Sequence, residues 1–275
     1  MGRLSDRRQA ISERVEPPSG NDAHYRGRCD TATVVHLLAE LTQSGCSDEA
    51  PSIAPLNGVA DERQPNANID RKLVEKIHAH WADRKNYDRD WDQRAAMAAS
   101  GLSKPCWVSD IGCGPHQSLK NYLPHGSRYL PADMQRWNTN VVHCDLNAGD
   151  VPVLRLLSSD VVFILGVLEY LTDVPSSLRH VSKWCDRVIF SYVAAEHEWQ
   201  FDLWINRYSR RQIMELWNAA GFDVTESRII APGSYVFTAT RRKRVSPSLR
   251  RAARLAILLT QVVLVGGLNA VSSHD

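Results

Sequence analysis

Trp107-Val-Ser-Asp-Ile-Gly-Cys-Gly114 is a short apolar run that ends in a carboxylate and two glycines one residue apart. Tryptophan, valine and isoleucine favour a packed strand, and the glycines free the backbone for a tight turn that a ligand can approach closely. In an open α/β sheet, a carboxylate at the end of a strand, here Asp110, faces the ligand crevice. The stretch therefore predicts a nucleotide-like ligand at the end of a buried strand.

The residues after the turn distinguish between two kinds of nucleotide site. A dinucleotide fold requires a third glycine, Gly-x-Gly-x-x-Gly, whereas this chain continues Pro115-His-Gln-Ser-Leu119. This disfavours a nicotinamide-dependent oxidoreductase. Asp-Ile-Gly-Cys-Gly at residues 110–114 instead resembles motif I of the class I S-adenosylmethionine-dependent methyltransferases. The resemblance implies S-adenosylmethionine as the cofactor, held by Asp110, Gly112, Cys113 and Gly114.

Two further acids follow predicted strands. Residues 128–134 read as a strand that ends at Asp133, which lies 19 residues beyond Gly114. At this distance, related folds place a carboxylate on the ribose hydroxyls. Residues 140–147 predict a third strand ending in Asp145, and the resemblance implies that this acid and the backbone after it meet the adenine. The predicted cofactor site thus gains Asp133, Met134, Asp145 and Leu146.

Residues 158–171 contain the most specific second motif. Asp160 starts an unbroken apolar run, as a strand buried on both faces requires, and Gly166 interrupts the run where backbone approaches a ligand. The run resembles motif IV of the same family, in a Gly-Val-Leu-Glu-Tyr version similar to that of a subset of bacterial small-molecule methyltransferases. Gly166 is added to the predicted cofactor site. For Glu169 two roles remain possible, a catalytic base or a structural residue.

Helices and strands alternate through the rest of residues 69–240. The pattern predicts one or two amphipathic helices from residue 70, whose aromatic residues are interpreted as core. It then predicts a helix over 174–184, a strand over 187–193, a helix over 210–220 capped by Ser209, and strands over 222–230 and 234–240. We expect a Rossmann-like, doubly wound, mostly parallel seven-stranded sheet, with an antiparallel edge strand and helices on both faces.

Catalytic candidates follow the fifth predicted strand. Methyl transfer to a nucleophilic acceptor needs alignment and desolvation, whereas a hydroxyl acceptor also needs a base. The candidates are Tyr192, Glu196 and His197, with His116 and Glu169 as further groups. The alternative is that Glu196 and His197 are solvated loop residues. The acceptor stays open among small molecules, lipid precursors and saccharides, and the alternative function is a non-catalytic partner or regulatory protein with this fold.

Composition limits the partners and the compartment. The 275 residues are 43% apolar and 23% charged, as in ordinary globular proteins. Residues 71–240 carry 19 basic and 19 acidic side chains, which argues against a nucleic-acid-binding core. Six cysteines lack zinc-site spacing, so no metal is predicted, and reduced thiols in a cytoplasmic protein are expected.

The two ends of the chain differ from this domain. Residues 1–68 are polar and proline-rich, and predict a largely disordered extension without a secretory signal. Residues 241–275 form a basic linker and an apolar helix, whose uncharged residues 255–271 would span about 26 Å. Basic residues beside an apolar helix fit association with an anionic membrane surface. The alternative is a helix packed on the domain or in a dimer interface, and the oligomeric state stays open.

Overall fold

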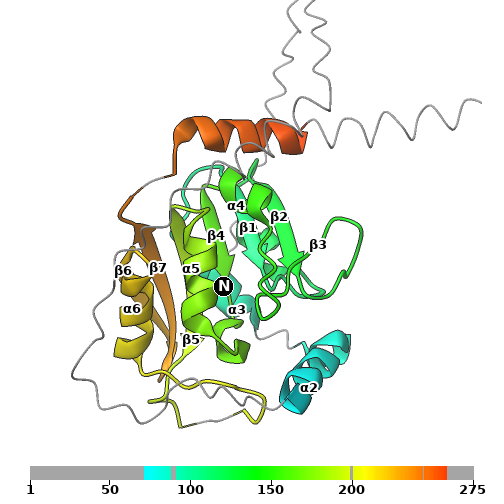
Figure 1. The fold of residues 1–275 in the computed structure, drawn as a ribbon, viewed down its shortest axis with the longest axis vertical. Helices are drawn as coiled ribbons and strands as arrows, with labels where there is room; N and C mark the ends of the chain where they lie inside the picture. The colour runs from blue at the N-terminus through cyan, green and yellow to red at the C-terminus, as the bar shows by residue number, and fades with distance from the viewer. Residues whose placement is uncertain (1–70, 88–90, 199–200, 244, 259–275) are drawn as a thin grey trace, which may run out of the picture. The chain divides into compact units, whose positions relative to one another are not determined.

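The computed structural model describes residues 71–258, with gaps at 88–90, 199–200 and 244. All described residues belong to one compact unit, residues 56–275, and Figure 1 shows its sheet and helices. The predicted N-terminal extension, residues 1–68, lies outside the described residues. So do residues 259–271 of the predicted apolar helix.

Seven strands form one sheet. They are β1 Trp107–Ile111, β2 Arg128–Asp133, β3 Val142–His143, β4 Val161–Ile164, β5 Arg187–Val193, β6 Phe222–Ala231 and β7 Ser234–Arg241. Their order is β3-β2-β1-β4-β5-β7-β6, and β1 to β5 are parallel. The mostly parallel sheet is therefore confirmed. The antiparallel strand is β7, which lies between β5 and the edge strand β6. A two-residue turn containing Gly233 joins β6 and β7 as a hairpin.

Helices precede and separate the strands. They are α2 Arg71–Ala82, α3 Trp91–Ala99, α4 Val153–Ser158, α5 Val174–Ser182, α6 Arg210–Ala219, the 3₁₀ turns η1 Arg84–Asn86, η2 Ser118–Tyr122 and η3 Leu168–Tyr170, and a helix over residues 247–258. As predicted, α6 begins at Ser209, whose side chain accepts from the Gln212 backbone N–H in a capping box. The helix α4 was not predicted, because six residues are too few to show a helical period.

The core lies on both faces of the sheet because β4 is buried throughout. Val162 and Ile164 pack in a cluster with α5 and α6, whereas Val161 and Phe163 pack in a second cluster with α3. Alternate residues of a strand point to opposite faces, so this division requires helices on both sides of the sheet. The doubly wound architecture predicted from the sequence is confirmed.

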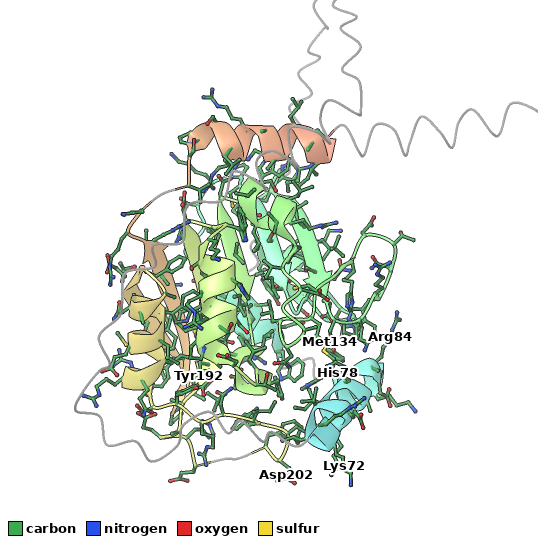
Figure 2. All side chains as sticks on the ribbon, viewed as in Figure 1. Lys72, His78, Arg84, Met134, Tyr192 and Asp202 are labelled. Carbon is green, nitrogen blue, oxygen red and sulfur yellow. The ribbon has the colours of Figure 1, made fainter. Side chains whose placement is uncertain are left out.

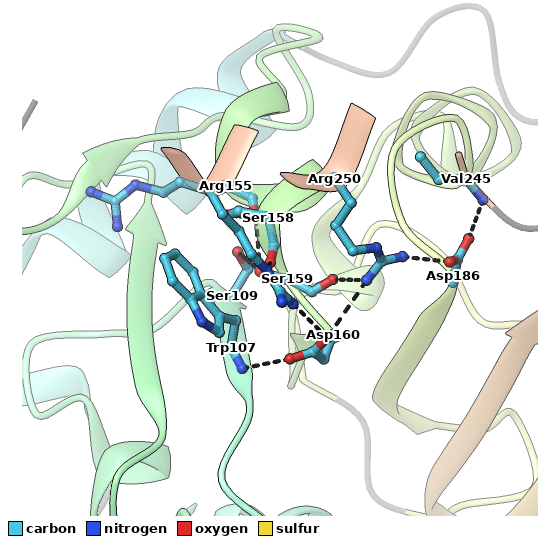
Figure 3. A network of polar contacts seen from close by, with 10 residues as sticks. Trp107, Ser109, Arg155, Ser158, Ser159, Asp160, Asp186, Val245 and Arg250 are labelled. Carbon is cyan, nitrogen blue, oxygen red and sulfur yellow. Dashed lines mark hydrogen bonds and ion pairs between the residues drawn. The ribbon is translucent and has the colours of Figure 1, made fainter. Parts of the chain in front are cut away.

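The helix over residues 247–258 lies against the amino ends of β1, β4 and β5 (Figure 3). Arg250 pairs with Asp186, and the Arg254 guanidinium donates to Asp160 at 2.6 Å. Asp160 also accepts from the Trp107 backbone N–H at 2.9 Å, which ties the helix to β1. The sequence analysis left two alternatives for this basic segment, contact with an anionic membrane surface or packing on the domain. Arg250 and Arg254 are paired with acids of the domain, which agrees with packing. Within the described residues, no helix has the length and apolar character needed to cross a membrane.

Candidate functional site

The carboxyl ends of the parallel strands open into a cavity of about 580 Å³, which is also lined by α2, η1 and α3. This is the edge at which open α/β sheets bind ligands. The structure brings all nine predicted cofactor residues into the cavity wall. They are Asp110, Gly112, Cys113, Gly114, Asp133, Met134, Asp145, Leu146 and Gly166.

The glycine turn after β1 is packed too closely to hold side chains. Gly112 has φ 75°, and a Cβ there would collide with the side chain of Val167. A Cβ at Gly114 would lie 2.9 Å from the ring of Tyr87, which follows η1. The turn therefore exposes its main chain to the cavity only because both residues are glycine.

Asp110 is almost completely buried beside this turn. It is 3% exposed, and its Oδ2 accepts a hydrogen bond from the Tyr129 hydroxyl at 2.6 Å. Burial raises the pKa of Asp110 to about 7; the Tyr129 hydrogen bond opposes this shift and nearby Asp133 adds to it. A cationic group in the cavity would favour the ionised form of Asp110.

Asp133 ends β2 and is held by the backbone. Its two oxygens accept from the N–H groups of Gly114 and Gln135, each at 2.9 Å. Burial raises the pKa of Asp133, and these two hydrogen bonds oppose the shift. Each carboxylate oxygen accepts more than one hydrogen bond, so Asp133 retains capacity for ligand hydroxyls.

Asp145 links the strand ends to the helix α2. Its Oδ1 accepts from the Asn147 backbone N–H at 2.9 Å, and its Oδ2 lies 3.4 Å from Nε2 of His78. Figure 2 shows His78 on α2 at the same end of the molecule as Met134. The predicted adenine-binding acid therefore lies next to a side chain of α2.

Tyr192 does not line the cavity. It is completely buried, its hydroxyl donates to Asn206 Oδ1 at 2.7 Å, and it accepts from the Tyr208 backbone N–H at 2.8 Å. Asn206 Nδ2 in turn donates to the carbonyls of Leu168, the first residue of η3, and Leu171, which directly follows it. Burial raises the pKa of Tyr192. Its place in the structure is that of a positioning residue for η3, not of a base in contact with a ligand.

Glu196 and His197 have different surroundings although they are adjacent. Glu196 is exposed and accepts from the Arg210 backbone N–H at the start of α6, at 3.0 and 3.2 Å, so it caps that helix outside the cavity wall. His197 lies in the cavity wall, as does His116 of the first turn. With His80 of α2, three histidines line the cavity and are among the groups that could accept a proton from a ligand.

Aromatic residues of α2 and α3 also line the cavity, which the sequence interpretation as core did not anticipate. The ring of Trp81 lies 5.5 Å from that of Trp91 and 5.2 Å from that of Tyr170. Trp81 is also 9% exposed, so it belongs to both core and cavity. The available signal was the concentration of tryptophan and tyrosine in a segment that is otherwise highly charged.

Arg94 and Glu169 supply opposite charges to the same cavity. The Arg94 guanidinium lies 5.2 Å from the ring centroid of Trp91 and occupies the space that a Cβ at Gly166 would need. Glu169 is 2% exposed; its Oε1 accepts from the Val193 backbone N–H at 2.9 Å, and its Oε2 has no partner among the described residues. Burial raises the pKa of Glu169, an effect that backbone hydrogen bonds and then Arg94 oppose.

Comparisons with known proteins support the fold. No family model and no curated protein matches the chain. A Burkholderia thailandensis 1,6-didemethyltoxoflavin-N1-methyltransferase, solved with its namesake compound and S-adenosylhomocysteine, is 18% identical, with TM-score 0.50 over 68% of this chain and 94% of that one. The partner of the Haloferax volcanii Trm112 methyltransferase activator is 16% identical, with TM-score 0.50 over 63% and 99%. The chain has the fold of class I S-adenosylmethionine-dependent methyltransferases.

Proposed function

We propose that this protein is an S-adenosylmethionine-dependent methyltransferase that acts on a small-molecule acceptor. The observation that carries the proposal is the meeting of the glycine turn with Asp110, Asp133 and Asp145 in one cavity of about 580 Å³. The solved structure with S-adenosylhomocysteine and a small-molecule acceptor has the same fold, which supports this reading.

The residues of the wall fit the cofactor chemically. Ionised Asp110 favours the ammonium of the methionine part, and the close-packed turn of Gly112 and Gly114 offers main chain where side chains would collide. Asp133 keeps acceptor capacity for ribose hydroxyls, and Asp145 accepts from the adenine amine. When bound, the cofactor supplies an activated methyl group on a sulfonium.

The protein's own contribution to transfer is alignment and exclusion of water. The helices α2 and α3 bring large aromatic side chains to the cavity, so a bound acceptor loses contact with solvent. If the acceptor is a hydroxyl, the wall histidines that can take its proton are His80, His116 and His197. Tyr192 and Glu196 hold η3 and α6 instead.

Calorimetric titration with S-adenosylmethionine, S-adenosylhomocysteine and NAD tests the proposal. We expect the two adenosyl compounds to bind and NAD to give no signal. The substitution Gly112→Val should abolish binding of both adenosyl compounds. Its side chain would collide with that of Val167 and displace the turn whose main chain meets the cofactor. The matched surface variant Glu215→Gln, whose carboxylate is 46% exposed on α6, should bind as the wild type does.

Two outcomes would contradict this function. If neither adenosyl compound gives a binding signal with a folded sample, the proposed cofactor is wrong. In a second assay, the protein is incubated with S-adenosylmethionine and a fractionated extract of small molecules. If it binds the cofactor but produces no S-adenosylhomocysteine, the alternative of a non-catalytic partner protein is favoured.

A further inference from the structure

The cavity has two chemically different ends on either side of the glycine turn. The strand β1 lies between β2 and β4 in the sheet. Asp133, which ends β2, and Asp145, which follows β3, therefore lie on one side of the turn. Gly166 and Glu169, which follow β4, lie on the other side, with Arg94 of α3 against Gly166. The second end is not used by the cofactor roles assigned above, apart from Gly166.

Glu169 brings an unsatisfied hydrogen-bond acceptor to this second end. Its side chain is 2% exposed and lines the cavity, and only one of its two oxygens has a hydrogen-bond partner among the described residues. A buried carboxylate oxygen without a partner is unfavourable, so a ligand donor placed there would bind with little competition from protein groups.

Arg94 brings hydrogen-bond donors to the same end. Its guanidinium carries five N–H groups in a fixed fork and lies over the ring of Trp91. It interacts electrostatically with Glu169. When Glu169 is ionised, the two side chains present a cationic donor and an anionic acceptor, with no net charge between them.

Aromatic rings border this polar pair. The guanidinium lies over Trp91, and Trp81 lies 5.5 Å from Trp91 and 5.2 Å from Tyr170, which adjoins Glu169 in η3. Rings of this size bind flat aromatic ligands through stacked and edge-to-face contacts. The second end is therefore apolar on its sides and has a donor–acceptor pair at one point.

We propose that Arg94 and Glu169 form the polar anchor of the acceptor subsite, and that the acceptor is a flat, neutral heteroaromatic ring whose edge carries an N–H beside a C=O. The N–H donates to Glu169, and the carbonyl accepts from Arg94. An anionic ring would meet the Glu169 carboxylate, and a cationic ring would meet Arg94. This inference rests on the proposed function, since it names the acceptor class for the same cavity.

Tryptophan fluorescence titration with a matched pair of probes tests the anchor. Quinolin-2(1H)-one carries N–H beside C=O, and N-methylquinolin-2(1H)-one lacks the donor. Both are titrated with and without S-adenosylhomocysteine. We expect the wild type to bind the first probe about tenfold more tightly, the difference that one hydrogen bond of ordinary strength produces.

The variants separate the roles of the two side chains. Glu169→Gln should remove the tenfold difference, because an amide that accepts from Val193 presents its NH₂ to the probe. Arg94→Met should weaken binding of both probes, since both retain the carbonyl. Glu215→Gln is the matched control and should keep the full difference. Affinity for S-adenosylhomocysteine should stay unchanged in Glu169→Gln.

Three results would overturn the proposal: no saturable response to quinolin-2(1H)-one, equal affinity for the two probes, or a difference that persists in Glu169→Gln. Tighter binding of quinoline-2-carboxylate than of either probe would also overturn it, in favour of an anionic acceptor. A failure of the proposed function looks different, because the protein would then not bind S-adenosylhomocysteine, whatever the probes do.

Discussion

Asp110 makes the cavity sensitive to pH. Burial raises its pKa to about 7, so near neutral pH the free protein holds this carboxyl partly protonated. A raised pKa means that the folded state binds its proton more tightly than the unfolded state does. Its contribution to folding is therefore full below about pH 4 and is lost as the pH rises through about 7.

Ligand binding should show the opposite trend. Because the ammonium of S-adenosylhomocysteine favours the ionised carboxylate, its affinity should increase with pH, by up to about tenfold per unit below the pKa and levelling off above it. Calorimetry from about pH 6 to about pH 8 measures this slope. The substitution Asp110→Asn should weaken binding and flatten the profile. If the affinity of Asp110→Asn changes with pH as steeply as that of the wild type, a group other than Asp110 causes the pH dependence.

At the scale of single residues, the candidate cofactor residues all line the cavity, whereas the catalytic candidates Tyr192 and Glu196 do not. Asp110, Asp133 and Asp145 lie at or just after the carboxyl ends of short apolar strands, so local pattern suffices to place them. Tyr192 and Glu196 depend on partners elsewhere: Asn206 for the first and the start of α6 for the second. No local pattern reveals such contacts, and none reveals that Arg94 lies against Gly166.

The secondary-structure elements divide in the same way. Strands and capped helices have local signals, so β1, β2, β5 and α6 were predicted nearly to the residue. The six-residue α4 is too short to show a helical period, and the two-residue β3 is shorter than the strand predicted over residues 140–147. The position of β7 inside the sheet depends on tertiary packing, which no local pattern shows. Element type was therefore predictable, whereas the placement of short elements was not.

The helix over residues 247–258 offers a test of stability at this scale. Arg250→Ala leaves the acidic groups Asp186 and Asp160 without this cationic partner at the amino ends of the strands. The loss of partly buried charged hydrogen bonds should lower the free energy of unfolding by roughly 1–3 kcal/mol. Thermal unfolding monitored by circular dichroism measures the change.

A matched arginine serves as the control. Arg211 pairs with Glu215 four residues later on the surface of α6, where the two side chains are 75% and 46% exposed. Because such a pair contributes only about 0.3–0.5 kcal/mol, Arg211→Ala should scarcely change the midpoint of unfolding. Equal effects of the two substitutions would mean that the contacts of Arg250 do not stabilise the domain.

Over the whole molecule, the Arg250 contacts and the cavity lie at opposite ends of the parallel strands. Sites that share no partners have independent energetic effects. A hundredfold excess of S-adenosylhomocysteine over its Kd should therefore stabilise wild type and Arg250→Ala alike, by about 2.7 kcal/mol. Paired unfolding curves with and without ligand check this. A change of more than about threefold in ligand affinity in Arg250→Ala would show that the two ends are coupled.

This separation also sets how the protein can be mounted on a surface. Leu255 is 55% exposed on the helix over residues 247–258, remote from the carboxyl ends of the strands. If Leu255 is replaced by a residue with a reactive side chain, a chemical linker attached there would orient each molecule with the mouth of the cavity toward the bulk solution. An array prepared in this way would let dissolved compounds be screened by direct optical detection, with every immobilised copy presenting the same open side.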